Sequence, residues 1–326
     1  MTSLVLRRPR PHATVAVVGV VVAALATSCS LPDGAAPVPP ASAASEGAAS
    51  GEPSTAPSPE RATVTQALTA DGIELVLTVP IVAADGTGGG EAVTVTPDED
   101  ASSRVTFALP ADEAAPVASS GGTPTGTADG SDAVSTAVPA TIDLVSPADG
   151  SLVRNSDGSV TVLDAAGTPL GGLSAPEATE TSGAAGRAGV VVVAPTRAEV
   201  HAKARGATPS GTGGATGDGA GPAQGWTVTT WLGAQGVRSA TWGNREGGRS
   251  LAVDPTPWAR QSGIVGEATA WAQLVASEPE AASTTMRDQF DCHALGATDK
   301  KTWNLEPWRP DVGFLATAAA RCNPTA

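Results

Sequence analysis

Aromatic residues are almost absent from most of this 326-residue chain. Residues 29–225 contain one, Phe107, whereas all seven tryptophans lie within residues 226–326. Burial of large apolar side chains supplies much of the free energy that drives folding. The sequence therefore predicts that the best-packed domain is C-terminal and spans residues 226–326.

Basic residues are scarce as well. Residues 29–225 carry 23 acidic and 7 basic side chains, whereas residues 226–326 carry 10 and 9. Binding to a phosphate backbone needs a clustered surplus of lysine and arginine, which neither part has. We therefore expect no nucleic-acid partner, and we assign the acidity to the N-terminal region.

The common catalytic and metal-binding motifs are also missing. The sequence contains no GxSxG, Walker loop, HExxH or CxxC pattern. The acidic run Asp98–Asp100 lacks the glycine loop of a calcium site, and we interpret it as a solvated turn. His293 is the sole histidine near Cys292 and Cys322, too few ligands for zinc. We therefore expect no metal and no cofactor.

The start of the chain has the layout of a secretory signal. Three arginines precede the apolar run 13–25, which is shorter than the roughly 20 residues that a membrane-spanning helix needs. The run ends in Leu-Ala-Thr-Ser-Cys29. This ending resembles the lipobox of bacterial lipoproteins. The alternative is an ordinary secretory signal followed by a chance cysteine.

The lipobox resemblance implies that residues 1–28 are removed and that the thiol of Cys29 receives a lipid. The protein would then be anchored on the extracytoplasmic face of the cell membrane. The two remaining cysteines, Cys292 and Cys322, form an even pair in an oxidising environment, so a disulfide is expected. A bridge that closes a loop of about 30 residues stabilises by about 3.5 kcal/mol in the chain-entropy model.

The composition predicts that the mature chain alternates between disordered and folded segments. Residues 29–61 are a disordered stalk rich in Ala, Pro and Ser, with an expected r.m.s. span of about 30 Å. Residues 62–205 form a β-rich region with a low-complexity break near 115–137. Residues 206–225 are a Gly/Thr-rich linker to the C-terminal domain.

Short runs rich in Val and Thr predict strands in the β-rich region. We expect strands at 73–79, 92–96, 105–109 and 190–193, and a hairpin over 159–170. Together they predict one small β module that is poor in aromatic residues.

The C-terminal domain mixes strand and helix signals, which predicts an α+β fold. Alternating apolar residues predict a hairpin of 226–231 with 237–242. Helical spacing predicts a helix that Ser262 caps and that Pro279 ends, with its buried face formed by Ile264, Val265, Ala268, Trp271, Ala272 and Val275. Further helices are expected from Ser283 or Thr284 and over 313–321, with a turned loop at 303–310.

Four stretches of this domain resemble a known family. They read SATWGNREGGRSLAVDPTPWAR, MRDQFDCHA, KKTWNLEPWRPDV and RCNP, and they span Ser239 to Pro324. They are similar to the bacterial domain-of-unknown-function family 2599, which is found in secreted and lipid-anchored proteins. The resemblance implies a domain boundary and supports the disulfide, and it implies no activity.

One polar group offers a catalytic hypothesis. His293 follows Cys292, whose bridge would hold its backbone still, as a general base or acid requires. Asp288 or Asp311 would orient the imidazole, and Arg309 would stabilise an anion. The alternative is structural: His293 bonds a carbonyl oxygen, and Arg309 pairs with Glu306 or stacks on Trp308.

The tryptophans offer a second hypothesis. Trp258, Trp303 and Trp308 neighbour prolines and turns, so they could form a platform for sugar rings or another apolar partner. The alternative is that they belong to the core.

The sequence therefore favours a non-enzymatic surface interaction module, lipid-anchored and offered to a cell-wall or envelope protein partner. A secreted hydrolase or toxin-like domain using His293 and a cell-wall glycan binder are the two alternatives.

Overall fold

The computed structural model describes residues 62–81, 92–110, 139–180, 185–204, 225–245 and 247–325. The signal segment 1–28, Cys29, the stalk 29–61, the break at 115–137 and residues 206–224 lie outside the described residues, so those assignments stay predictions. All the described residues fall within one compact unit, Arg61–Ala326.

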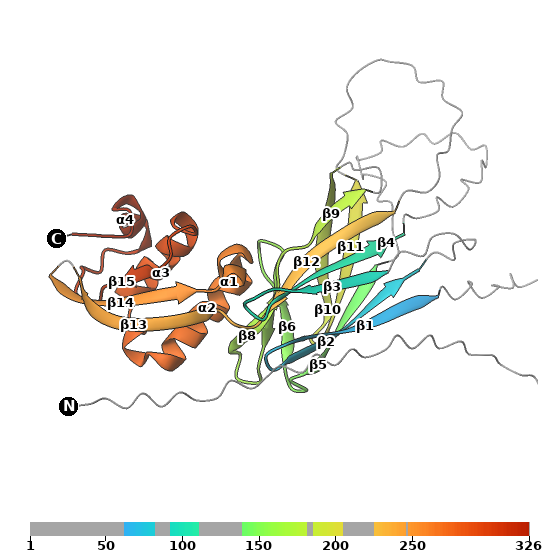
Figure 1. Ribbon diagram of the computed structural model, residues 1–326, viewed down its shortest axis with the longest axis horizontal. Helices are drawn as coiled ribbons and strands as arrows, with labels where there is room; N and C mark the ends of the chain where they lie inside the picture. The colour runs from blue at the N-terminus through green and yellow to red at the C-terminus, as the bar shows by residue number, and fades with distance from the viewer. Residues whose placement is uncertain are drawn as a thin grey trace, which may run out of the picture. The chain divides into compact units, whose positions relative to one another are not determined.

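Five strands form the first sheet, in the order β1-β2-β5-β11-β10 (Figure 1). Neighbouring strands are antiparallel throughout. Their bounds are β1 Thr63–Ala70, β2 Ile73–Pro80, β5 Ala140–Ser146, β10 Gly186–Ala194 and β11 Arg197–Ala204.

Seven strands form the second sheet, in the order β3-β4-β12-β8-β7-β6, with β9 also paired to β12. Their bounds are β3 Val93–Pro97, β4 Ser103–Leu109, β6 Ser151–Arg154, β7 Val160–Leu163, β8 Pro169–Leu173, β9 Glu177–Glu180 and β12 Trp226–Gly233.

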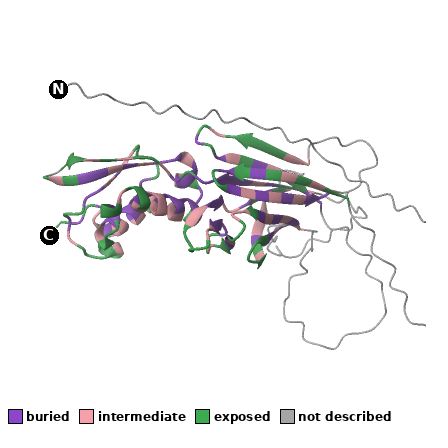
Figure 2. Ribbon diagram, turned by 90° about the horizontal axis from the view of Figure 1, so that it is seen from below, coloured by how far each residue is buried: buried purple, intermediate pink, exposed green. Residues whose placement is uncertain are grey.

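The two sheets share one hydrophobic core and so form a β-sandwich. In β2, Leu75, Leu77 and Val79 are fully buried and alternate with less buried residues. Figure 2 shows the same alternation of buried and exposed residues along the strands. The strands predicted at 73–79, 92–96 and 105–109 and the hairpin over 159–170 are confirmed. A strand also covers 190–193, but the expectation that it is buried is wrong, because β10 is an edge strand on which Val190 is buried and Val191 and Val193 are exposed.

The remaining residues form a three-stranded sheet, ordered β13-β14-β15, with helices packed against it (Figure 1). A second core holds Trp258, Phe290 and Trp303. The element bounds are β13 Val237–Arg245, β14 Gly248–Pro255, α1 Pro257–Gln261, α2 Ile264–Ser277, the 3-10 helix η1 Pro279–Ala281, α3 Thr284–Gly296, β15 Trp303–Leu305 and α4 Phe314–Ala319.

The predicted hairpin of 226–231 with 237–242 is wrong. Strand β12 pairs with β4, from Trp226 opposite Leu109 to Leu232 opposite Ser103, and β13 pairs with β14 instead. Val228 and Leu232 are buried in the sandwich core, and their burial stabilises the pairing of β12 with β4. The domain boundary predicted at Trp226 therefore falls at a strand of the second sheet.

The fold class also needs correction. The described chain is mostly β-sheet with a few helices, so α+β gives the helices too much weight. The reason is that all four α-helices of the described residues begin at or after Pro257, whereas strands fill most of the described residues before it. None of the helices among the described residues is both long and apolar enough to cross a membrane.

Helix α2 exists as predicted but turns a different face to the core. Its buried residues are Val265, Gly266, Thr269, Ala270 and Leu274, while Ile264 is exposed. Small residues face inward because α2 lies close to the backbone of β8 and of the residue before β13. A Cβ on Gly172 of β8 would lie 3.0 Å from Val265 Cγ2, and one on Gly236 would lie 2.5 Å from Ala270 Cα.

The predicted cap of α2 is wrong as well, because Ser262 ends α1 and the N-cap of α2 is Gly263. The missing cap comes from the turn between β6 and β7, where Asp157 Oδ2 accepts a hydrogen bond from Ile264 N at 2.8 Å. A Cβ on Gly263 would lie 2.1 Å from that oxygen, and φ there is +69°, so the site needs glycine.

A second sandwich carboxylate caps α1. Asp100, in the turn between β3 and β4, accepts from Trp258 N at 2.9 Å through Oδ2. Its Oδ1 accepts from the Ser102 hydroxyl, which in turn accepts from Trp231 Nε1 at 2.8 Å. Carboxylates satisfy the free N–H groups and favour the positive end of a helix. The sandwich thus supplies an N-terminal cap to both α1 and α2.

We expect Asp157→Ala to lower the free energy of unfolding by about 1–2 kcal/mol, since it removes a turn bond and the cap of α2. Asp164→Ala is the matched control, because Asp164 holds the neighbouring turn through Ala166 N and Thr168 N and caps no helix. Urea unfolding measures both losses, and amide exchange at Ile264 should quicken only in Asp157→Ala. Equal losses with unchanged exchange at Ile264 would contradict the cap.

Candidate functional site

Helix α3 positions the residues proposed for catalysis. It begins after Ser283, whose hydroxyl accepts from Met286 N at 3.3 Å, as the sequence predicted. The Cys292–Cys322 disulfide is confirmed, with 5.5 Å between the two Cα atoms. It ties α3 to the residues that follow α4.

His293 lies in the core rather than in a cleft. Its side chain is nearly fully buried, and its ring stacks on Trp303 at 6.4 Å between centroids. Its Nε2 lies 3.2 Å from the carbonyl oxygen of Asn304. A carbonyl can only accept, so Nε2 donates and carries the ring proton. Burial lowers the pKa of His293 to about 4, helped by the charge of Lys300.

The two carboxylates proposed to orient His293 lie elsewhere. Burial raises the pKa of Asp288, and the neighbouring charges of Asp311 and Asp291 add to the rise. Within the part of the chain that the structure describes, neither Asp288 nor Asp311 bonds His293. The acid–base group inferred from the sequence is therefore not assembled.

Arg309 has a structural role. Its guanidinium is buried, pairs with the buried carboxylate of Glu306 and donates from Nη1 to Pro324 O at 3.2 Å. Gln289 joins this group, donating to Glu306 O at 3.0 Å and accepting from Glu306 N at 2.9 Å. The alternative pairing of Arg309 with Glu306 is the one observed, and it fastens the C-terminal segment to α3.

The three tryptophans of the ligand hypothesis differ in how far they are buried. Trp258 and Trp303 are fully buried in the core, so neither can face a ligand. Trp308 is 45% exposed, with the Arg309 guanidinium 4.7 Å from its ring centre. Its ring lies against Gly248, where a Cβ would come within 2.2 Å of the indole nitrogen.

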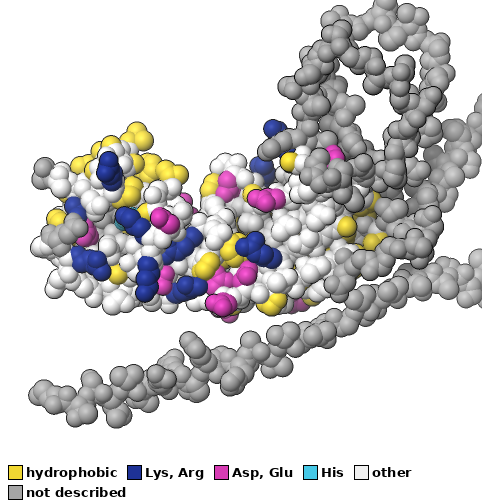
Figure 3. Space-filling view, turned by 45° about the horizontal axis from the view of Figure 1, so that its top comes forward, with side chains coloured by type: hydrophobic (Ala, Val, Ile, Leu, Met, Phe, Trp, Pro, Cys, Tyr) yellow, Lys and Arg dark blue, Asp and Glu magenta, His cyan; other side chains and the backbone are white. Residues whose placement is uncertain are grey.

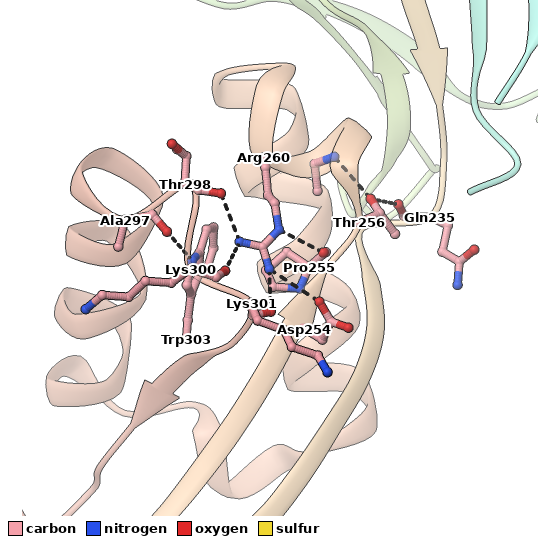
Figure 4. A network of polar contacts seen from close by, with 11 residues as sticks. Gln235, Asp254, Pro255, Thr256, Arg260, Ala297, Thr298, Lys300, Lys301 and Trp303 are labelled. Atoms are coloured by element: carbon pink, nitrogen blue, oxygen red, sulfur yellow. Dashed lines mark hydrogen bonds and ion pairs between the residues drawn. The ribbon is translucent and has the colours of Figure 1, made fainter. Parts of the chain in front are cut away.

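Sequence reasoning missed Arg260, whose side chain holds the loop before β15 in place (Figure 4). Its Nε donates to Pro255 O, Nη1 donates to Thr298 O and Lys300 O, and Nη2 contacts Lys301 O and Asp254 Oδ1. All five N–H donors of the guanidinium are therefore used. Lone arginines give no hint of such a role in sequence, because three of the acceptors are backbone carbonyls 38–41 residues away.

The sequence also missed a carboxyl group that titrates near neutrality. Burial raises the pKa of Glu267 to about 7, with Asp291 adding to the rise. Arg287 lies between them, 2.9 Å from Glu267 Oε1 and 2.7 Å from Asp291 Oδ1. Among the described residues, no group of three or more His, Cys, Asp or Glu side chains is arranged to hold a metal ion.

An open sheet edge is the strongest candidate for a binding site. Strand β13 lies at the edge of its sheet, and Arg245 faces Gly248 across a two-residue turn. Such a pair is hydrogen-bonded, and alternate residues then point their N–H and C=O groups away from the partner strand. Ala240, Trp242 and Asn244 therefore present free backbone groups along the outer edge.

Only the start of this edge is covered. Gln273 of α2 accepts from Gly236 N at 2.8 Å and from Val237 N at 3.3 Å, and it donates to Ala234 O. Beyond it lies a hollow of about 290 Å³ between β13 and the end of α2. Arg238 and Arg245 are exposed at the two ends and form no ion pair with any described residue. The edge is thus open, carries an arginine near each end, and is flanked by a hollow whose lining includes Glu278, which accepts from Trp242 Nε1 at 2.8 Å.

Comparison with known proteins places this region in a family. Residues 237–325 match the family model described as Protein of unknown function (DUF2599), which confirms the resemblance seen in the sequence. The match begins at β13, so the sandwich lies outside it.

Curated relatives extend the match without adding an activity. Two are the uncharacterized proteins Mb0487 of Mycobacterium bovis and Rv0477 of Mycobacterium tuberculosis, each 39% identical over 93 residues. The alignment covers 26% of this chain and 61% of each relative, so the chain spans less than two-thirds of their length. No solved structure matches.

We expect the buried His293 to make the protein less stable as the pH falls. The folded pKa of about 4 lies below the ordinary value of 6.5. The unfolded chain therefore takes up a proton first, and stability falls from pH 6.5 towards pH 4 by up to about 3 kcal/mol. His293→Gln should remove this loss relative to the parent chain, whereas His201→Gln, on the more exposed strand β11, should retain it. Urea unfolding across this pH range is the measurement, and parallel profiles for the parent chain and His293→Gln would contradict it.

Proposed function

We propose that this chain is a lipid-anchored cell-envelope protein that acts by binding rather than by catalysis. Its DUF2599 region takes up an extended segment of another envelope protein as an added strand on β13. The open edge of β13 is the observation that carries the proposal, since exposed edges pair readily with other strands.

The arrangement of the polar residues favours binding over catalysis. A general base needs a substrate within hydrogen-bond reach, whereas His293 is buried against the backbone of Asn304. Arg309 is held by Glu306 and is not free to meet an anion. The hydrolase hypothesis therefore gains no support from the geometry, and the glycan hypothesis keeps only Trp308.

The chemistry of the edge selects an acidic partner. Arg238 and Arg245 lie at its two ends, and β13 contains no acidic residue. An added strand with Asp or Glu at its ends would pair with both arginines, and its intervening side chains could enter the hollow beside Gln273. A second copy of β13 would bring its own arginines to a cationic edge, which disfavours self-pairing.

Photo-crosslinking tests this site in cells that produce the anchored protein. A photoreactive residue at Thr241, exposed on β13, should give a discrete protein adduct. The same residue at Ala67, exposed on the edge strand β1, should give none. Asn244→Pro removes one outward N–H of β13, and we expect it to reduce the Thr241 adduct at least about fivefold.

Thr65→Pro is the control, because Thr65 is likewise an outward position on an edge strand, β1. It should leave the Thr241 adduct unchanged. Absence of an adduct at Thr241, or an adduct that survives Asn244→Pro in a folded protein, would contradict strand addition at β13.

The anchor is tested separately through Cys29. Cells labelled with a clickable fatty acid should incorporate it into the parent chain, and Cys29→Ser should abolish the label. Cys322→Ser is a control that removes a different cysteine and should retain it. Continued labelling of Cys29→Ser would refute lipidation at this residue.

A further inference from the structure

Helix α4 exposes an apolar face. Leu315 is 82% exposed, and Ala316 and Ala319, which lie beside it on the helix surface, are exposed as well. The only polar side chain of α4, Thr317, is buried. The outward face of α4 therefore consists entirely of apolar side chains.

A second leucine extends this face. Leu295 of α3 is 76% exposed and follows Cys292 by three residues, so it lies on the side of α3 that the disulfide ties to the end of α4. Val312, just before α4, is 43% exposed. Figure 3 shows hydrophobic side chains gathered at the α3–α4 end of the molecule, with basic side chains among and beside them. We name Leu295, Val312, Leu315, Ala316 and Ala319 the α4 surface.

The charges around the α4 surface suit an anionic lipid bilayer. Arg321 lies two residues after α4, and Lys300 and Lys301 follow α3 beside the exposed Asp299; the three basic residues are exposed and form no ion pair with a described residue. Asp311 lies at the other end of α4, so the end with Arg321 is the one that approaches headgroups. Apolar side chains that enter the interface, with cations at headgroup level, are the pattern of membrane-surface binding.

The length of chain between Cys29 and the first described strand also favours the membrane as the partner of the α4 surface. Residues 30–61 separate Cys29 from the first described strand, and the stalk predicted from their sequence would have an r.m.s. span of about 30 Å. A lipid on Cys29 would hold the folded unit within reach of the bilayer at high effective concentration, so weak contacts would suffice.

We propose that the α4 surface rests on the outer leaflet of the membrane that carries the anchor. This inference extends the proposed function, because the lipid on Cys29 brings the surface to the bilayer. Contact at α4 would fix the orientation of the anchored protein and so the direction in which β13 faces.

The test uses residues 30–326 without lipid, so that the α4 surface is measured apart from the anchor. This protein is mixed with vesicles of phosphatidylcholine containing phosphatidylglycerol and then floated through a density gradient. We expect it to float with the vesicles. Leu295→Asp/Leu315→Asp should lower the floated fraction about tenfold, since two leucines that would enter the bilayer are lost and two negative charges are added beside an anionic surface.

Val191→Asp/Val193→Asp is the matched control, with two exposed apolar residues of β10 replaced in the same way. It should float like the parent. Failure of the parent to float, or equal losses in both double variants, would overturn the proposal. Cys29 labelling in cells is unaffected by either result, so failure of the α4 surface and failure of the anchor are distinguishable.

Discussion

Two carboxylates from a β-sandwich cap the first two helices of the DUF2599 region, and the arrangement of the C-terminal half depends on them. Asp100 bonds the N-terminus of α1, and Asp157 bonds the N-terminus of α2. Helix α2 has glycine as its own N-cap and no side chain there to replace Asp157. Because α1 contacts β12 and α2 contacts both β8 and β13, the two caps help to fix how the free edge of β13 is presented.

Side-chain packing, as well as hydrogen bonding, joins the sandwich to the DUF2599 region. Strand β12 completes the second sheet, and its Trp231 belongs to the core of the DUF2599 region. A Cβ on Gly233 would lie 2.4 Å from Trp258, so the indole lies directly against the β12 backbone. The sequence predicted an aromatic-rich C-terminal domain and a separate, small β module before it. The described part of the N-terminal region instead packs directly against that domain.

Local signals in the sequence predicted local structure well. Alternation in residues 73–79, the start of a helix at Ser283 or Thr284 and the paired cysteines were each identified from a few neighbouring residues or from cysteine count. The failures concern distant partners. Strand β12 resembles half of a hairpin, yet its partner β4 lies more than a hundred residues earlier, and Asp157 lies 107 residues before Ile264. The sequence left two roles open for His293, and the bond to Asn304 O supports the structural one, which depends on how α3 packs on β15.

The two carboxylate caps and the shared packing couple the sandwich to the DUF2599 region, and hydrogen exchange across a denaturant series measures this coupling. We expect amides of β2 and β4 and amides of α2 and α3 to lose protection in one cooperative transition with the same midpoint. Replacing Asp100 and Asp157 together should shift that midpoint for both groups. Separate transitions, with α2 and α3 still protected after β4 has opened, would show that the two parts unfold independently.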